Sequence, residues 1–268
     1  MPLHIGICTL NAMRTLPAVL ESINSAGRHT ELWIVDSGST DDTVKFAKSE
    51  GAQVLHRDWD GMVGQRRFIL DHCRSNGAKW ALMLDADEWP TATLWEAIDN
   101  IVSTAPPQIS GATLNRQLLL HGKPLRFVCQ PERRLRLVRP ERATVIGSCG
   151  EQAEGIHDRI ETDGSTIALP GTLMHDAFAD VEDALSRNLG YARVEADNNP
   201  TNGSLFKLVA SPLAAFCKQW FLKGGFLDGR RGFLMSQTMA MITWQKHLLA
   251  AEKRWLIQRN APPGKTYR

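Results

Sequence analysis

The sequence predicts an α/β protein built on an open, doubly wound, mostly parallel sheet with helices on both faces. Two observations in the first hundred residues predict this fold class. Short apolar runs bounded by turn residues, typical of buried parallel strands, recur as HIGICTL, ELWIVDS, AQVLHRD and KWALMLD. Helix-like segments alternate with these runs over about 13–26, 41–50, 64–76 and 91–104. Repeated strand–helix units join neighbouring parallel strands through right-handed crossovers.

The pattern changes after residue 110. Short β-like pieces with many turns follow, namely GATLNRQ, LRFVCQ, RRLRLVR and STIALPG. From about residue 176 the spacing of apolar residues is helical, and we expect further helices over 204–222 and 229–258. The sequence therefore predicts an α/β domain over residues 1–175 and a helical C-terminal extension over residues 176–268.

Composition and charge narrow the class of function. The 268 residues include 31 Lys and Arg against 29 Asp and Glu. A nucleic-acid-binding protein usually shows a strong basic excess, so we expect no nucleic-acid partner. The five cysteines are an odd number without a zinc-binding spacing, as expected of free thiols in a reducing cytosol. Because we find neither a signal peptide nor a membrane-spanning apolar run, we expect a cytoplasmic protein.

Basic residues are concentrated near the C-terminus. Residues 201–268 contain six Lys and five Arg against two acidic residues, interleaved with Trp and Phe, whereas residues 1–200 carry an acidic excess. This combination suits docking on anionic lipid headgroups. The alternative is that the aromatic side chains pack on the core and the basic side chains face water.

Polar side chains follow the predicted strands, and ligands of doubly wound sheets bind beyond the carboxyl ends of the strands. These side chains are Thr9 and Asn11 after the first strand, Asp36 after the second, and Asp85-Ala86-Asp87-Glu88 after the fourth. Two carboxylates at i and i+2 can turn toward one cation, and hard oxygen ligands suit Mg²⁺ or Mn²⁺. The alternatives are a solvated acidic turn after the fourth strand and simple helix capping after the second.

A longer pattern connects these residues to a family. The run IVDSGSTDDTVKFAKSEGAQVLHRDWDGMVGQRRFIL, followed by WALMLDADEW, resembles family 2 glycosyltransferases, which have the GT-A fold. More narrowly, DSGSTD, the Gln-basic segment and DADE resemble the bacterial lipopolysaccharide core β-1,4-glucosyltransferase group. The resemblance is close over residues 1–100, looser over 110–175, and present again at KGGFLDGRRGF.

On the donor side, the resemblance implies a binding site for a nucleotide sugar. The residues that would contact the nucleotide sugar are Thr9, Asn11, Asp36, Gln65, Arg66, Asp85 and Asp87. Asp87 and His175 would bind a divalent metal, Mg²⁺ or Mn²⁺. Ala12 stands where relatives usually have Glu, so we expect one nucleotide contact to be lost or replaced.

On the acceptor side, the resemblance implies that Glu151 is the carboxylate general base, although Gly150 stands where relatives often have His. Glu88, Arg133 and Arg136 are expected to contact acceptor or phosphate groups, since arginine recognises phosphate bidentately. Without the resemblance, Glu151 is equally consistent with a surface position and His175 with a local hydrogen bond. The arginines are equally consistent with a solvated edge strand.

Together these features predict an inverting, metal-dependent glycosyltransferase. It would move a hexose, glucose from UDP-glucose, to the inner-core heptose of lipopolysaccharide or lipooligosaccharide. Its acceptor would be lipid-anchored, and the protein would be peripheral on the anionic inner face of the cytoplasmic membrane. The alternatives are a family 2 enzyme of capsule or O-antigen synthesis, a nucleotidyltransferase, and a noncatalytic nucleotide-binding protein. The segment TLNAMRT lacks the glycines of a nucleotidyltransferase phosphate loop.

Overall fold

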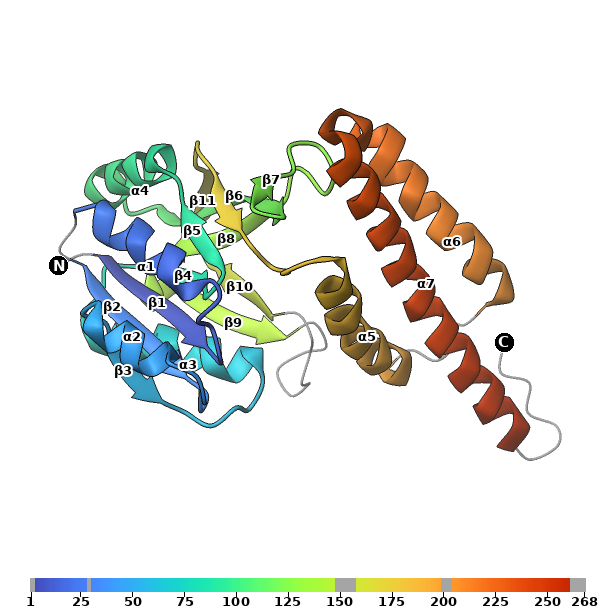
Figure 1. Cartoon of the computed structure of the whole chain (residues 1–268). Coiled ribbons are helices and arrows are strands. Elements are labelled where there is room, and N and C mark those ends of the chain that lie inside the picture. Colours follow the sequence, from blue (N-terminus) through green and yellow to red (C-terminus); the bar gives the residue numbers. More distant parts are fainter. Residues whose placement is uncertain (1–2, 28–29, 148–157, 199–203, 261–268) are drawn as a thin grey trace. The chain divides into compact units, whose positions relative to one another are not determined.

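The computed structural model of the protein describes residues 3–27, 30–147, 158–198 and 204–260 (Figure 1). The chain divides into two compact units. The first contains Met1–Gln117 and Pro131–Asp176, and the second contains Leu118–Gln130 and Ala177–Arg268. The second unit therefore takes residues from the middle of the chain as well as from its C-terminal part.

The first unit begins with the predicted alternation of strands and helices. Its parallel strands lie in the order β3-β2-β1-β4. They are β1 (Leu3–Thr9), β2 (Glu31–Asp36), β3 (Gln53–His56) and β4 (Trp80–Asp85). The helices between and after them are α1 (Leu16–Ser25), α2 (Thr43–Ser49), α3 (Met62–Ser75) and α4 (Ala92–Thr104). All of these elements are expected from the sequence, with ends that differ by a few residues.

Helices cover both faces of this parallel sheet. Along β4, Trp80, Leu82 and Leu84 point to one face, where they pack with α1 and α4. Ala81 and Met83 point to the other face and pack with α3. This alternation follows from the two-residue repeat of a strand, and it explains why the inner strands are mostly apolar.

Antiparallel strands extend the sheet beyond β4. β8 (Arg133–Val138) lies between β4 and β6 (Ile109–Leu120), and β12 (Leu173–His175) and β5 (Glu88–Pro90) follow on the far side of β6. Three further strands and a short 3₁₀ helix complete the unit: η1 (Pro140–Arg142), β9 (Ala143–Gly147), β10 (Asp158–Thr162) and β11 (Ser165–Ala168). The predicted α/β fold is confirmed, and the antiparallel strands make the sheet a mixed one.

The second unit is mainly helical. It contains α5 (Val181–Asn198), α6 (Leu205–Cys217), the π-helical turn η3 (Lys218–Leu222), the 3₁₀ turn η4 (Gly225–Asp228) and α7 (Gly229–Asn260). The helices α5 and α6 both pack along α7 (Figure 1). Among the described residues, no helix is both long enough and apolar enough to span a membrane.

The segment LRFVCQ, expected to be β-like, is instead a turn that follows the two-residue strand β7 (Lys123–Pro124). The reason is that the backbone amides of this segment donate hydrogen bonds to side chains about 100 residues later in the chain. The backbone amides of Arg126, Phe127 and Val128 all donate to the Asp228 carboxylate, at 2.8–3.0 Å. The amide of Cys129 donates to Gln219 Oε1 at 2.9 Å. These donors are therefore unavailable to a strand ladder, and we call this arrangement the Asp228 clasp.

Glycines explain the motif KGGFLDGRRGF. Gly224 and Gly229 have φ of 72° and 61°, in the left-handed region that glycine adopts without strain. A Cβ on Gly232 would lie 1.9 Å from the carbonyl oxygen of Gly225, so only glycine fits where α7 passes η4. The motif therefore encodes a tight, fixed turn between α6 and α7.

Candidate active site

The carboxyl end of β2 holds Asp36 in a network of hydrogen bonds. Its buried carboxylate accepts from Thr9 Oγ1 at 2.8 Å, from Ser39 through both the amide and the hydroxyl, and from the amide of Gly38. Burial alone would raise the pKa of Asp36, but the hydrogen bonds from Ser39, Thr9 and Gly38 hold it below its ordinary value. Asp36 thus stays ionised and fixes the loop after β2 beside the end of β1.

Asn11 supports the same loop from β1. Its φ is 49°, and its side-chain Oδ1 accepts from the amides of Thr40 and Asp41 at 2.8 and 3.3 Å. Its own amide donates to Ser39 Oγ at 2.8 Å. Thr9, Asn11 and Asp36 therefore lie together at the carboxyl edge of the sheet, as the sequence predicts.

At the end of β4, two arginines bind the first carboxylate of the DAD motif. Asp85 pairs with Arg66 through Oδ1, and its Oδ2 accepts from Arg136 at 2.6 Å. Arg66 also pairs with Asp158 at 2.8 Å. Burial would raise the pKa of Asp85, but the positive charge of Arg66 lowers it below its ordinary value. Asp85 is therefore an ionised carboxylate whose two oxygens are both engaged by guanidinium groups.

Glu88 lies at the centre of a buried charge cluster. Its Oε1 accepts from Arg116 at 3.1 Å and from Arg136 at 2.7 Å, and its Oε2 accepts from the amide of Asp85 at 3.1 Å. Arg116 in turn pairs with Glu132. Burial, followed by the negative charge of Asp85, raises the pKa of Glu88 well above its ordinary value. Glu88 and Arg136, which were predicted to contact acceptor or phosphate groups, are instead paired with each other inside the protein, together with Arg116, Glu132 and Asp158.

Asp87 and His175 meet next to this cluster. The antiparallel register of β5 and β12 places His175 opposite Glu88, and Asp87 Oδ1 lies 3.6 Å from His175 Nε2. Burial, followed by the charge of Arg116, lowers the pKa of His175 to about 4. His175 is therefore neutral at pH 7, which is the form in which imidazole binds a metal.

This pair would suit a divalent cation held by few protein ligands. Among the described residues there is no group of three or more His, Cys, Asp and Glu side chains that could bind an ion. Mg²⁺ and Mn²⁺ nevertheless bind through one or two protein ligands together with substrate phosphates and water. Because both oxygens of Asp85 are engaged by arginines, Asp87 and His175 are the side chains suited to contact such an ion.

Arg14 holds Asp176, the residue that follows His175. Its guanidinium donates to the Asp176 carboxylate at 2.6 Å and to the Asp176 carbonyl at 2.5 Å, and the Asp176 amide donates to the carbonyl of Asp87 at 2.9 Å. Asp176 therefore connects the loop after β1 to the end of β12. Arg14 was not selected from the sequence, because nothing local to MRT signals this long-range contact.

We expect Arg14→Gln to weaken Mn²⁺ binding on the order of tenfold, since residues that orient metal ligands have effects of that size. Calorimetric titration of the full chain with Mn²⁺ in the presence of UDP would measure the change. Arg187→Gln, which removes a similar ion pair with Asp183 on the surface of α5, is the control. Equal Mn²⁺ affinity in both variants would show that Arg14 does not position His175.

Three other residues that the sequence predicts for the site lie outside the two groups described above. Gln65 is buried in α3 and donates to the carbonyl of Asp58 at 2.7 Å, so it holds the segment before α3. Arg133 is at the start of β8 with an exposed side chain. Glu151 and Gly150 lie outside the described residues, and the role of Glu151 as general base stays a prediction.

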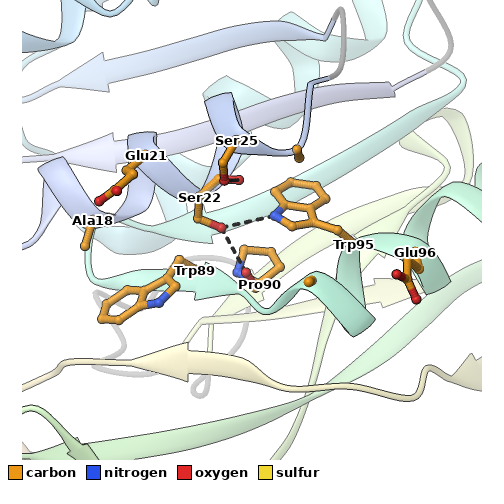
Figure 2. A pocket seen from close by; sticks show the side chains of 10 residues that line it. Ala18, Glu21, Ser22, Ser25, Trp89, Pro90, Trp95 and Glu96 are labelled. Carbon is orange, nitrogen blue, oxygen red and sulfur yellow. Dashed lines mark hydrogen bonds between the residues drawn. The ribbon is translucent and has the colours of Figure 1, made fainter.

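A shallow pocket of about 440 Å³ lies elsewhere on the first unit, between α1, β5 and the start of α4 (Figure 2). Ser22 at its centre donates to the carbonyl of Pro90 at 2.8 Å and accepts from Trp95 Nε1 at 3.0 Å (Figure 2). None of the predicted site residues lines this pocket, and these polar groups bond to one another. The candidate site is therefore the carboxyl edge of the sheet.

Comparisons with known proteins show what this chain is similar to. Residues 4–116 match the sequence family described as Glycosyl transferase family 2. The lipopolysaccharide core biosynthesis glycosyltransferase LpsC of Rhizobium meliloti (strain 1021) is 27% identical, over 94% of this chain and 95% of that protein. An uncharacterised glycosyltransferase of Rickettsia prowazekii (strain Madrid E) is 28% identical, over 81% of this chain and 77% of that protein.

Among solved structures, S. aureus TarS 1-349 in complex with UDP-GlcNAc aligns with 100% of this chain and 93% of that chain, with a TM-score of 0.45 and 13% sequence identity. The family match spans β1 to β6 and so contains Asp36, Asp85 and Asp87. Residues 4–116 therefore match a family 2 glycosyltransferase domain, and the similarity to LpsC over most of the chain identifies the protein as a glycosyltransferase.

Proposed function

We propose that this glycosyltransferase moves glucose from UDP-glucose to a heptose of the lipopolysaccharide or lipooligosaccharide inner core, with inversion at the anomeric carbon. The observation that carries the proposal is the Asp87–His175 pair beside the arginine-bound Asp85 at the carboxyl end of β4. The similarity to LpsC over nearly the whole chain supports an acceptor in the lipopolysaccharide core.

The donor would lie along the carboxyl edge of β1, β2 and β4. The nucleoside fits against Thr9, Asn11 and Asp36, whose loop is already fixed by hydrogen bonds. The diphosphate fits next to Asp87 and His175. Arg66 and Arg136 come from α3 and β8 to this end of β4, where they pair with Asp85 and so fix the carboxylate beside the diphosphate position.

A divalent metal bound by Asp87 and His175 would supply positive charge to the leaving diphosphate. The protein's own contribution is to hold both ligands in place. β5–β12 pairing sets their separation, Arg14 fixes Asp176, and burial keeps His175 neutral. Because arginines engage both oxygens of Asp85, the metal would be held by Asp87 and His175 rather than by Asp85.

The acceptor hydroxyl must lose its proton as its oxygen attacks the anomeric carbon, and UDP leaves with the electron pair of the broken bond. We propose that Glu151 takes this proton. Glu151→Gln is expected to lower kcat on the order of 10²–10⁴-fold, the usual contribution of a general base, and to leave UDP-glucose affinity within about twofold of wild type. Single-turnover transfer and calorimetric titration would measure both. Unchanged turnover would remove Glu151 from the mechanism.

A lipid-anchored acceptor requires the enzyme to work at the anionic inner face of the cytoplasmic membrane, as a peripheral protein. The test of the whole proposal is transfer of labelled glucose from UDP-glucose, with Mn²⁺ or with EDTA, to a core acceptor that ends in heptose. UDP-galactose and GDP-glucose are the donor controls. Metal-dependent transfer from UDP-glucose alone would support the proposal, and transfer from another donor or to a different acceptor would replace it.

A further inference from the structure

The apolar surface of this protein is concentrated on the second unit. Among the described residues, the large hydrophobic side chains with high exposure all belong to that unit, except Leu10 and Trp59. Monomeric soluble proteins rarely expose contiguous apolar surface of this kind without a binding function. The uneven distribution therefore points to an interaction surface on the helical unit.

One part of this surface is a face of α6. Phe206, Val209 and Leu213 follow the i, i+3, i+7 spacing that places side chains on one side of a helix, and all three are exposed, Phe206 at 78%. No residue of α6 is buried, although the helix packs along α7. Lys207 is its only charged residue. We call these three residues the α6 face.

The second part is the turn that follows α6. Phe221, Leu222, Phe226 and Leu227 are all exposed there, Leu222 at 83%, and we call them the apolar tip. The Asp228 clasp ties the tip to residues 126–128. The ring of Phe226 contacts Trp220, which in turn contacts the rings of Phe216 and Phe233.

An apolar hollow adjoins the tip. It has a volume of about 370 Å³ and is lined by Trp220, Gly229, Arg230, Phe233 and Leu234. A hollow with purely apolar walls suits an acyl chain. Some of the aromatic residues of the C-terminal part thus pack on one another, while the tip and the α6 face remain exposed.

The charges around these residues favour an anionic partner. Between residues 204 and 245 the sequence holds five basic residues and one acidic residue, Asp228. The Asp228 carboxylate already accepts three backbone hydrogen bonds. A second copy of the chain would bring like charges together here. Further along α7 the basic charge is neutralised, because Lys246 and Lys253 pair with Glu195 and Asp197 of α5.

We propose that the α6 face and the apolar tip insert shallowly into an anionic lipid bilayer, with Lys218, Arg230 and Arg231 against the headgroups. Exposed aromatic and aliphatic residues next to basic ones bind at the boundary between headgroups and acyl chains. This inference rests on the proposed function, since it supplies the site by which the enzyme reaches a lipid-anchored acceptor. It goes beyond charge attraction, because it assigns much of the affinity to named apolar side chains.

The test is sedimentation of the full chain with vesicles of phosphatidylglycerol and phosphatidylethanolamine, compared with phosphatidylcholine vesicles. Leu222→Ser with Leu227→Ser is expected to lower the partition coefficient on the order of tenfold or more, because two large apolar side chains no longer leave water. Val209→Ser with Leu213→Ser should have an effect of similar size. Trp59→Ser, which removes an exposed hydrophobic residue of the first unit, is the matched control and should bind as wild type.

Transfer of glucose to a delipidated core oligosaccharide separates this inference from the proposed function. The tip variant should keep this activity while losing transfer to the same acceptor embedded in vesicles. Wild-type vesicle binding by both double variants, or no binding by the unaltered chain, would overturn the docking surface and leave the glycosyl transfer intact. A concentration-dependent dimer that Leu222→Ser dissociates would assign the surface to self-association instead.

Discussion

Asp87→Asn is expected to lower kcat on the order of 10²–10³-fold, the size of effect seen when one charge-stabilising group is removed from an active site. The amide has the shape of the carboxylate without its negative charge, so His175 would keep its place while Mn²⁺ affinity falls on the order of tenfold or more. Calorimetric titration with Mn²⁺ and UDP, and initial rates with UDP-glucose, would measure both quantities.

Asp71→Asn serves as the control for this variant, because Asp71 is a surface carboxylate of α3 that pairs with Arg74. Its metal affinity and turnover should match the wild type. If Asp87→Asn bound Mn²⁺ normally, the ion would be held elsewhere, and the assignment of the Asp87–His175 pair as the metal site would be wrong.

Arg136→Met is expected to destabilise the protein by about 3–5 kcal/mol, the cost of removing one partner from a buried ion pair. Arg136 donates to both Asp85 and Glu88, and the fully buried Glu88 would not regain water when the guanidinium is lost. Methionine keeps most of the side-chain volume, so the loss of stability reports the removal of the charge rather than a change in packing. Urea unfolding would give the change in the free energy of unfolding.

Arg134→Met on the same strand is the matched control. Arg134 also pairs with a carboxylate, Glu132, but its side chain is 44% exposed, so the expected loss is at most about 1 kcal/mol. Adding Glu88→Gln to Arg136→Met should recover part of the lost stability, because it removes a buried charge left without that partner. If Arg136→Met lost no more stability than Arg134→Met, the stability of the buried charge cluster would not depend on Arg136.

The parallel strands of the sheet could be predicted because each corresponds to a short apolar run bounded by turn residues. A strand such as WALMLD is apolar on both faces, and only a strand covered by helices on both sides tolerates that. The antiparallel strands were harder to predict from the sequence. LRFVCQ has the apolar residues of a strand, yet Asp228, about 100 residues later, takes up its amides. Such a contact leaves no signal in the segment itself.

The residues of the candidate site likewise fall into those that local sequence patterns predicted and those that depend on distant contacts. Asp85 and Asp87 follow a recognisable strand, and the resemblance to family 2 pointed to His175, which the fold brings next to Asp87. Arg116 and Glu132 were missed, because their roles depend on the pairing of β6 with β8. One signal could have found the first of them. An arginine within an apolar strand must have a buried partner, since an unpaired buried charge is too costly.

The division of the chain limits how this enzyme could be shortened or recombined. The backbone crosses between the two units three times, after residues 117, 130 and 176. A chain ending at residue 176 would lose Asp228, Gln219 and Met235, and with them the partners of Leu118–Gln130. Exchange of the helical unit between related enzymes must therefore transfer two separate stretches of sequence together, and a single C-terminal fusion would leave an unsupported apolar loop in the middle of the catalytic domain.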